Sequence, residues 1–143
     1  MILDSVLTIS NNQRQQIFAF AKEAAPHECC GLIGGNATGI AQSIYPLRNV
    51  ARNPMNAYEA GPEDLFAAQR EMRERGEQLL AIYHSHPRAA EPEPSETDLR
   101  LAYYPQAIYF IVGLAGERPV MRAFKIYEAE SRWEAVEYAI AGE

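Results

Sequence analysis

The segment LLAIYHSHPRAAEPEPSETD, which covers Leu79–Asp98, is the part of the sequence that is most informative about the fold. It opens with a continuous apolar run that ends at His84, and such a run is typical of a strand buried on both faces of a sheet. A loop rich in Pro and Glu follows, and Ser95 then supplies a side chain typical of a helix N-cap. The segment therefore predicts a strand, a loop and the start of a helix within a domain of mixed α and β structure.

Two histidines stand at the C-terminal end of this predicted strand. Residues two apart on a strand point to the same face, so His84 and His86 can present ring nitrogens to one metal ion while Ser85 points away. Zinc binds His nitrogens and carboxylate oxygens, and catalytic zinc sites typically keep three protein ligands and one open position. Asp98 is the natural third ligand.

Both halves of this pattern also have a simpler interpretation. Ser95 and Asp98 have the spacing of a capping box, and imidazoles at a strand end can be satisfied by backbone carbonyls. Two of the chain's three histidines share one face of the predicted strand, and Asp98 follows them closely in sequence. This combination favours metal binding. A capping box is compatible with that role, because a helix beginning at Ser95 would aim Asp98 from its first turn.

Length and composition indicate one globular domain that spans residues 1–143. Hydrophobic residues make up 48% and charged residues 22%, as in soluble proteins. Thirteen basic and nineteen acidic side chains give a net charge of −6, and the arginines are scattered along the chain. This distribution argues against a nucleic-acid partner.

The sequence also predicts a cytoplasmic protein with no membrane partner. The N-terminus lacks the basic and long apolar regions of a signal peptide, and no apolar run reaches the roughly 20 residues that a membrane span needs. The only cysteines, Cys29 and Cys30, are adjacent. They cannot form a disulfide framework, which agrees with a reducing compartment.

Hydrophobic periodicity, caps and turn residues predict the remaining elements of a central sheet flanked by helices. The expected strands are Ser5–Ile9, Cys30–Gly35 with its hairpin partner Ile40–Leu47, Ala107–Leu114 and Val120–Tyr127; the expected helices are Gln13–Ala24, Pro62–Arg75 and Ser95–Tyr103. Residues 133–140 fit either a strand, by the alternation of Val136, Tyr138 and Ile140, or a helix, by the spacing of the Glu residues, and a strand is favoured.

Glu28 is an acid at the start of the apolar strand that follows it, where it breaks the local pattern. Locally inconsistent residues are candidates for functional sites, although a strand-end acid can also simply face solvent. The neighbouring His27 does not begin an H-E-x-x-H metal site, because the position four residues later is Gly31. We expect His27 to be a surface residue, and Cys29 and Cys30 to be buried apolar residues and not nucleophiles.

Together, these residues resemble the JAMM (MPN+) metallopeptidases. The family is marked by an upstream Glu, then His-Ser/Thr-His-Pro, seven residues, Ser, two residues and Asp, and each position is present here: Glu28, His84-Ser85-His86-Pro87, Ser95 and Asp98. The likeness covers nearly the whole chain, and the chain is most similar to the compact bacterial members of the family. It implies a three-layer α/β fold of the cytidine-deaminase-like type, with a curved mixed sheet flanked by helices.

The resemblance also implies the chemistry. His84, His86 and Asp98 would bind one zinc ion per chain, Glu28 would be the general base that takes a proton from the zinc-bound water, and Ser95 would stabilise the oxyanion. The family hydrolyses amide or isopeptide bonds after the C-terminal Gly-Gly of ubiquitin-like proteins. These roles agree with general zinc chemistry, in which the metal lowers the pKa of its water to about 7.

The short connection after Asp98 narrows the range of substrates that we expect for this chain. Only about seven residues separate Asp98 from the next predicted strand near Gln106, which leaves little room for the inserted loops with which larger deubiquitinases grip ubiquitin. Compact bacterial relatives act on β-grasp sulfur-carrier proteins and release a cysteine attached to the Gly-Gly tail, so the resemblance implies such a partner. Two alternatives are a non-catalytic interaction module of the same fold and a peptidase that acts on small unrelated amides.

Overall fold

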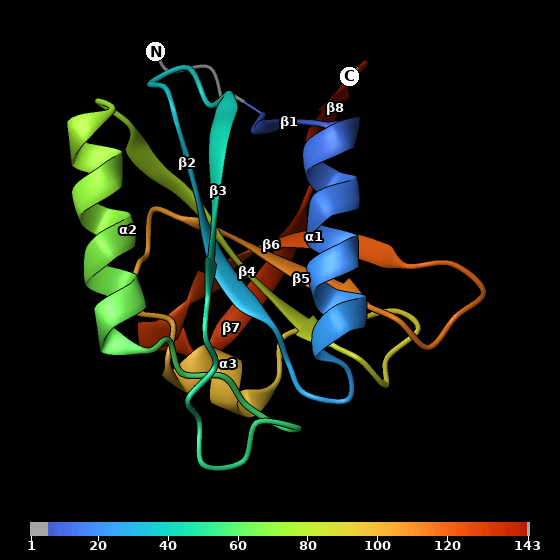
Figure 1. The fold of residues 1–143 in the computed structure, drawn as a ribbon. Coiled ribbons are helices and arrows are strands. Elements are labelled where there is room, and N and C mark those ends of the chain that lie inside the picture. The colour runs from blue at the N-terminus through green and yellow to red at the C-terminus, as the bar shows by residue number, and fades with distance from the viewer. Residues whose placement is uncertain (1–5, 143) are drawn as a thin grey trace.

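A six-stranded mixed sheet forms the centre of the structure, a computed structural model that describes residues 6–142 (Figure 1). The strands follow the order β3-β2-β4-β5-β6-β7. Their bounds are β2 (Cys30–Gly35), β3 (Ala41–Leu47), β4 (Gln78–His86), β5 (Ile108–Gly113), β6 (Val120–Tyr127) and β7 (Arg132–Val136). Strands β4 and β5 are parallel, and the other neighbours are antiparallel.

Helices cover both faces of this sheet and make three layers. Helix α1 (Asn11–Ala24) packs on one face and α2 (Pro62–Glu74) on the other. Alternate side chains of β4 enter the two cores, since Ala81 and Tyr83 belong to the core of α1 while Ile82 belongs to the core of α2. The predicted three-layer α/β architecture is confirmed.

Strand β4 lies between β2 and β5 at the centre of the sheet. Its residues 81–85 are all buried, as expected for a strand covered on both faces. Because β4 and β5 are parallel, the chain needs a crossover between them. The short helix α3 (Glu96–Arg100) lies in that crossover.

Local sequence signals fix the ends of the longer helices. Ser10 and Gln13 form a capping box, in which Ser10 Oγ accepts from the Gln13 amide at 3.0 Å and Gln13 Oε1 accepts from the Ser10 amide at 2.9 Å. Helix α1 therefore begins at Asn11, two residues before its predicted start. Helix α2 ends before Gly76, which has a φ of +70° and can adopt this left-handed conformation without a Cβ penalty.

The predicted helix from Ser95 to Tyr103 is wrong at its end, because α3 stops at Arg100. After the helix the Tyr104 amide donates to Tyr109 Oη at 3.3 Å, so a tertiary hydrogen bond replaces the helical pattern there. The predicted hairpin is confirmed, since β2 and β3 pair in antiparallel register.

The first and last strands among the described residues pair with each other. The strand expected over residues 133–140 is confirmed but divided: β7 continues the main sheet, while β8 (Ala139–Ala141) leaves it and pairs in parallel with β1 (Thr8–Ser10). The predicted first strand began at Ser5, which lies outside the described residues. Within residues 6–142 no helix combines the length and apolar character needed to cross a membrane.

Close packing between β2 and β4 gives a stability prediction. Gly31 lies directly opposite Tyr83, and a Cβ added at Gly31 would overlap the buried Tyr83 ring. We expect Gly31→Ala to lower the free energy of unfolding by about 1–3 kcal/mol, because overpacking forces buried groups to shift. Urea denaturation measures the change.

Gly116→Ala is the matched control, because the nearest atoms to its added Cβ lie at an ordinary 3.8 Å. Equal unfolding midpoints for Gly31→Ala and the wild type would contradict the proposed packing constraint.

Candidate active site

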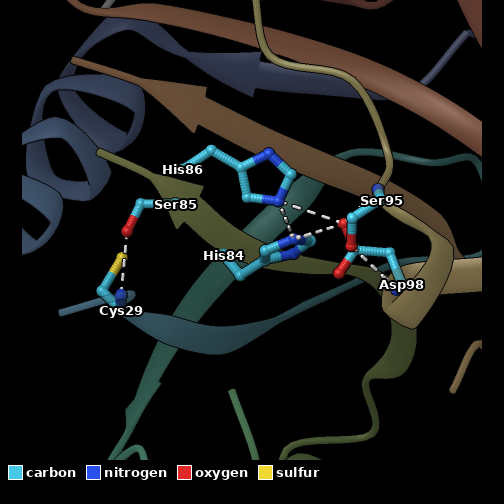
Figure 2. Close-up of polar contacts among 6 residues, drawn as sticks. All are labelled: Cys29, His84, Ser85, His86, Ser95 and Asp98. Atoms are coloured by element: carbon cyan, nitrogen blue, oxygen red, sulfur yellow. Dashed lines mark hydrogen bonds and ion pairs between the residues drawn. The ribbon is translucent and has the colours of Figure 1, made fainter. Parts of the chain in front are cut away.

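Three potential ligand atoms meet at the C-terminal end of β4 (Figure 2). The Nε2 atoms of His84 and His86 are 3.1 Å apart, and they lie 3.2 and 3.1 Å from Oδ2 of Asp98. Ligands bound at about 2.0–2.1 Å to a tetrahedral ion are about 3.3–3.4 Å apart. The three atoms therefore already have nearly the spacing that one metal ion requires.

A capping box aims the carboxylate of Asp98. Its Oδ2 accepts a hydrogen bond from the Ser95 amide at 2.9 Å, and Ser95 Oγ accepts one from the Asp98 amide at 3.1 Å. The same Oδ2 faces both imidazoles. The capping and metal-binding interpretations of this segment thus hold together, because the cap presents the oxygen to the histidines.

The protonation states of Asp98 and His84 suit a metal centre, whereas burial lowers the pKa of His86 but Asp98 outweighs this effect and raises it. Burial opposes the ionisation of Asp98, but the nearby imidazoles and the Ser95 amide outweigh it and hold the pKa of Asp98 well below its usual range. Burial lowers the pKa of His84, partly offset by Asp98, and favours the neutral imidazole that a metal needs.

Ser85 points to the opposite face of the sheet, as predicted, and ties β4 to the residue after Glu28. Its Oγ accepts from the Cys29 amide at 2.8 Å, and its own amide donates to the Cys29 carbonyl at 3.2 Å (Figure 2). Farther along the same pair of strands, Cys30 lies opposite His84. Continuing this antiparallel register outward brings Glu28 beside His86.

Glu28 is a buried acid that faces the two histidines. Its carboxylate and the ring nitrogens of His84 and His86 lie within 4.8 Å of one another, and this group could hold a metal ion. The side chain is 5% exposed, and within residues 6–142 its Oε1 has no hydrogen-bond partner. Burial raises the pKa of Glu28 to about 7, with His86 lowering it and Asp98 raising it further. A carboxylate with this pKa can accept and return a proton at neutral pH.

Other predicted residues take the expected positions. Cys29 and Cys30 are buried, and burial raises the pKa of their thiols to about 11 and about 12, which keeps them protonated. They are not nucleophiles. His27 is exposed, as predicted.

The loop between β3 and α2 supplies residues that the sequence did not single out. Tyr58 stacks on His84 with ring centroids 4.4 Å apart. Asn49 donates to the carbonyl of Glu28 at 2.9 Å. The only sequence signals were one aromatic residue and one of three Asn residues in residues 48–60, and such residues are common in loops.

A largely apolar cavity of about 630 Å³ lies on the side of Tyr58, although neither His84 nor His86 lines it. Tyr58 both stacks on His84 and lines this cavity. Tyr103 and Tyr104 also lie in its wall. The candidate metal centre is therefore next to a space large enough for part of a substrate.

Fold and site together define an α/β protein with a candidate metal centre at the end of its central strand. Residues 10–127 match the family model described as prokaryotic homologs of the JAB domain, and the chain belongs to this family. The predicted JAMM/MPN resemblance is confirmed.

Curated relatives carry peptidase names. The chain is 33% identical over 112 residues to the desampylase of Haloferax volcanii, covering 75% of this chain and 80% of the relative. It is 34% identical over 125 residues to a probable TtuB-protein conjugate cleaving protease of Thermus thermophilus, covering 87% and 79%. It is 30% identical over 125 residues to the CysO-cysteine peptidase of Mycobacterium tuberculosis, covering 86% and 84%. These names confirm the expectation of a peptidase.

Solved structures agree on the fold. A protein from Desulfitobacterium hafniense has a TM-score of 0.83 and 31% identity, with 96% of this chain and 94% of that chain covered. A JAB1/MPN domain protein from Archaeoglobus fulgidus has a TM-score of 0.64 and 21% identity, with 96% and 99% covered. The second likeness shows the fold alone.

The raised pKa of Glu28 predicts a pH-dependent stability in metal-free protein. Between pH 4.5 and about 7 the unfolded chain ionises Glu28 while the folded chain keeps its proton, so ionisation favours unfolding as the pH rises. Relative to Glu28→Gln, we expect wild type to lose about 3 kcal/mol across this window, at about 1.4 kcal/mol per pKa unit. Urea denaturation with chelator at several pH values measures the difference. A difference that does not vary with pH would contradict the burial of Glu28 as a neutral acid.

Proposed function

We propose that this chain is a zinc-dependent peptidase that hydrolyses the amide bond after the C-terminal Gly-Gly of a ubiquitin-like or sulfur-carrier protein. The observation that carries the proposal is the placement of the buried Glu28 carboxylate, whose Oε1 has no hydrogen-bond partner among the described residues, beside the ring nitrogens of His84 and His86, which also meet Asp98. Residues 1–143 act as one catalytic domain in this proposal.

His84, His86 and Asp98 would hold the zinc ion, since two imidazole nitrogens and a carboxylate oxygen are a common ligand set of catalytic zinc. When bound, zinc lowers the pKa of a water molecule and polarises the scissile carbonyl. Glu28 takes a proton from the attacking water and passes it to the leaving amine, a role that suits its pKa of about 7.

Ser95 stabilises the oxyanion in this proposal. Its Oγ already accepts a hydrogen bond from the Asp98 amide, so the hydroxyl hydrogen can be donated to the oxygen on which negative charge develops. No covalent intermediate is needed, because water is the nucleophile. Ser95 therefore acts as a hydrogen-bond donor and not as an attacking group.

The names of the relatives support the substrate class. They identify proteins that act on TtuB conjugates and on CysO-cysteine, together with a desampylase. For this chain we infer a small protein partner with an extended Gly-Gly tail, and cysteine is the leaving amine that the compact architecture favours. The complete donor set argues against a non-catalytic module.

Activity assays test this function. A β-grasp carrier that ends in Gly-Gly-Cys should be cleaved by the zinc-loaded protein, with one zinc per chain and loss of cleavage after chelation. Glu28→Gln should retain zinc but lower kcat by about 10²–10⁴-fold, because it removes proton transfer. Mass spectrometry of the products and metal analysis give both readouts.

Glu23→Gln is the matched control, because Glu23 is an exposed acid on α1, and it should cleave like wild type. Cleavage by Glu28→Gln at the wild-type rate, or the absence of zinc binding, would refute the mechanism. Cleavage of free Gly-Cys dipeptide but not of the carrier would refute the substrate class.

A further inference from the structure

The loop between β3 and α2, residues 48–60, encloses the backbone of Glu28. The Glu28 amide donates to the Pro54 carbonyl at 2.8 Å, and the Glu28 carbonyl accepts from Asn49 Nδ2 at 2.9 Å. The paired residues of β2 and β4 begin only at Cys30. The sheet alone therefore does not hold the main chain of Glu28, and the loop holds it on both sides.

One side chain, that of Asn49, organises this loop. Its Nδ2 donates a second hydrogen bond, to the Ala57 carbonyl at 3.0 Å. Its Oδ1 accepts from the amides of Ala51 and Glu59, each at 3.0 Å. The amide group thus makes two donated and two accepted bonds, which is the full set that an Asn offers with one bond per hydrogen and one per lone pair.

Two of these four bonds also fix the ring that covers His84. Ala57 and Glu59 are the neighbours of Tyr58 on either side, and Asn49 bonds to the backbone of both. Tyr58 stacks on His84 with an interplanar angle of 26°. Asn49 therefore links the backbone of Glu28 to the aromatic ring that packs on the imidazole of His84.

We propose that Asn49 is a positioning residue, which sets the carboxylate of Glu28 relative to His84 through these bonds to Glu28 and to the residues on each side of Tyr58. The inference rests on the proposed function, because it assigns Glu28 a proton-transfer role. A displacement of about 1 Å in a reacting group can cost about 10²-fold in rate. Asn49 contacts neither substrate nor the ligand atoms in this account and acts only through Glu28 and Tyr58.

Two variants separate the parts of this arrangement. Asn49→Asp keeps both accepted bonds, from Ala51 and Glu59, but loses both donated bonds, including the bond to Glu28. Asn49→Ala loses all four and introduces no charge. Asn36→Ala is the matched control, because Asn36 also orders a loop through its side chain, accepting from the amides of Thr38 and Ile40 in the β2–β3 turn.

In the zinc-loaded full chain, both Asn49 variants should lower kcat on the Gly-Gly-Cys carrier by about 10–100-fold, with KM and zinc stoichiometry unchanged. Asn36→Ala should keep the wild-type kcat. Amide hydrogen exchange at Glu28 should accelerate in both Asn49 variants, whereas the Glu59 amide should stay protected in Asn49→Asp.

Wild-type kcat in Asn49→Asp, or an equal loss of kcat in Asn36→Ala, would overturn the proposal. Unchanged exchange at Glu28 in both Asn49 variants would also overturn it. This last readout needs no substrate, so it remains decisive if the wild-type protein cleaves no Gly-Gly conjugate, a result that would refute the proposed function instead.

Discussion

A single carboxylate oxygen, Oδ2 of Asp98, joins the two parts of the chain that make the candidate site. It accepts a hydrogen bond from the Ser95 amide at the start of α3. It also lies 3.1–3.2 Å from the ring nitrogens of His84 and His86 at the end of β4. The crossover between β4 and β5 is thereby held against the strand it leaves. Together with the packing of Leu99 and Ala102 against the core on the α2 side, this contact fixes the orientation of α3, because a helix of one to two turns is not stable by itself.

Burial of Glu28 is the counterpart of this arrangement. A buried acid without a hydrogen-bond partner costs folding free energy, and proteins keep such residues mainly where they serve a function. Here the cost is offset by neighbouring structure, since Ser85 fixes the Cys29 amide and Asn49 fixes the Glu28 carbonyl. The same burial that destabilises the ionised form raises the pKa of Glu28 to about 7. Stability and proton transfer are therefore coupled at this residue.

Sequence reasoning predicted the features that local pattern determines. The apolar run before His84, the hairpin after Cys30 and the cap at Ser95 each depend on neighbouring residues, and the structure contains all three. The end of α3 was not predictable from the local pattern, because the chain after Arg100 follows tertiary bonds such as that from the Tyr104 amide to Tyr109 Oη. The roles of Asn49 and Tyr58 were not predictable, since they depend on where a loop folds back, 21 residues from Glu28 in the first case. The pairing of β8 with β1 likewise depends on contacts between the two ends of the chain.

In the proposed site Asp98 is the third metal ligand and Glu28 is the general base, although the Glu28 carboxylate also lies close enough to the histidines to be a ligand. Crystals grown with zinc and measured at the zinc absorption edge test this assignment directly. We expect a zinc ion bound to Nε2 of His84, Nε2 of His86 and Oδ2 of Asp98, with the Glu28 carboxylate farther from the ion than the bonding distance of about 2.2 Å. An ion bound to Glu28, with Asp98 making only its cap hydrogen bonds, would contradict it.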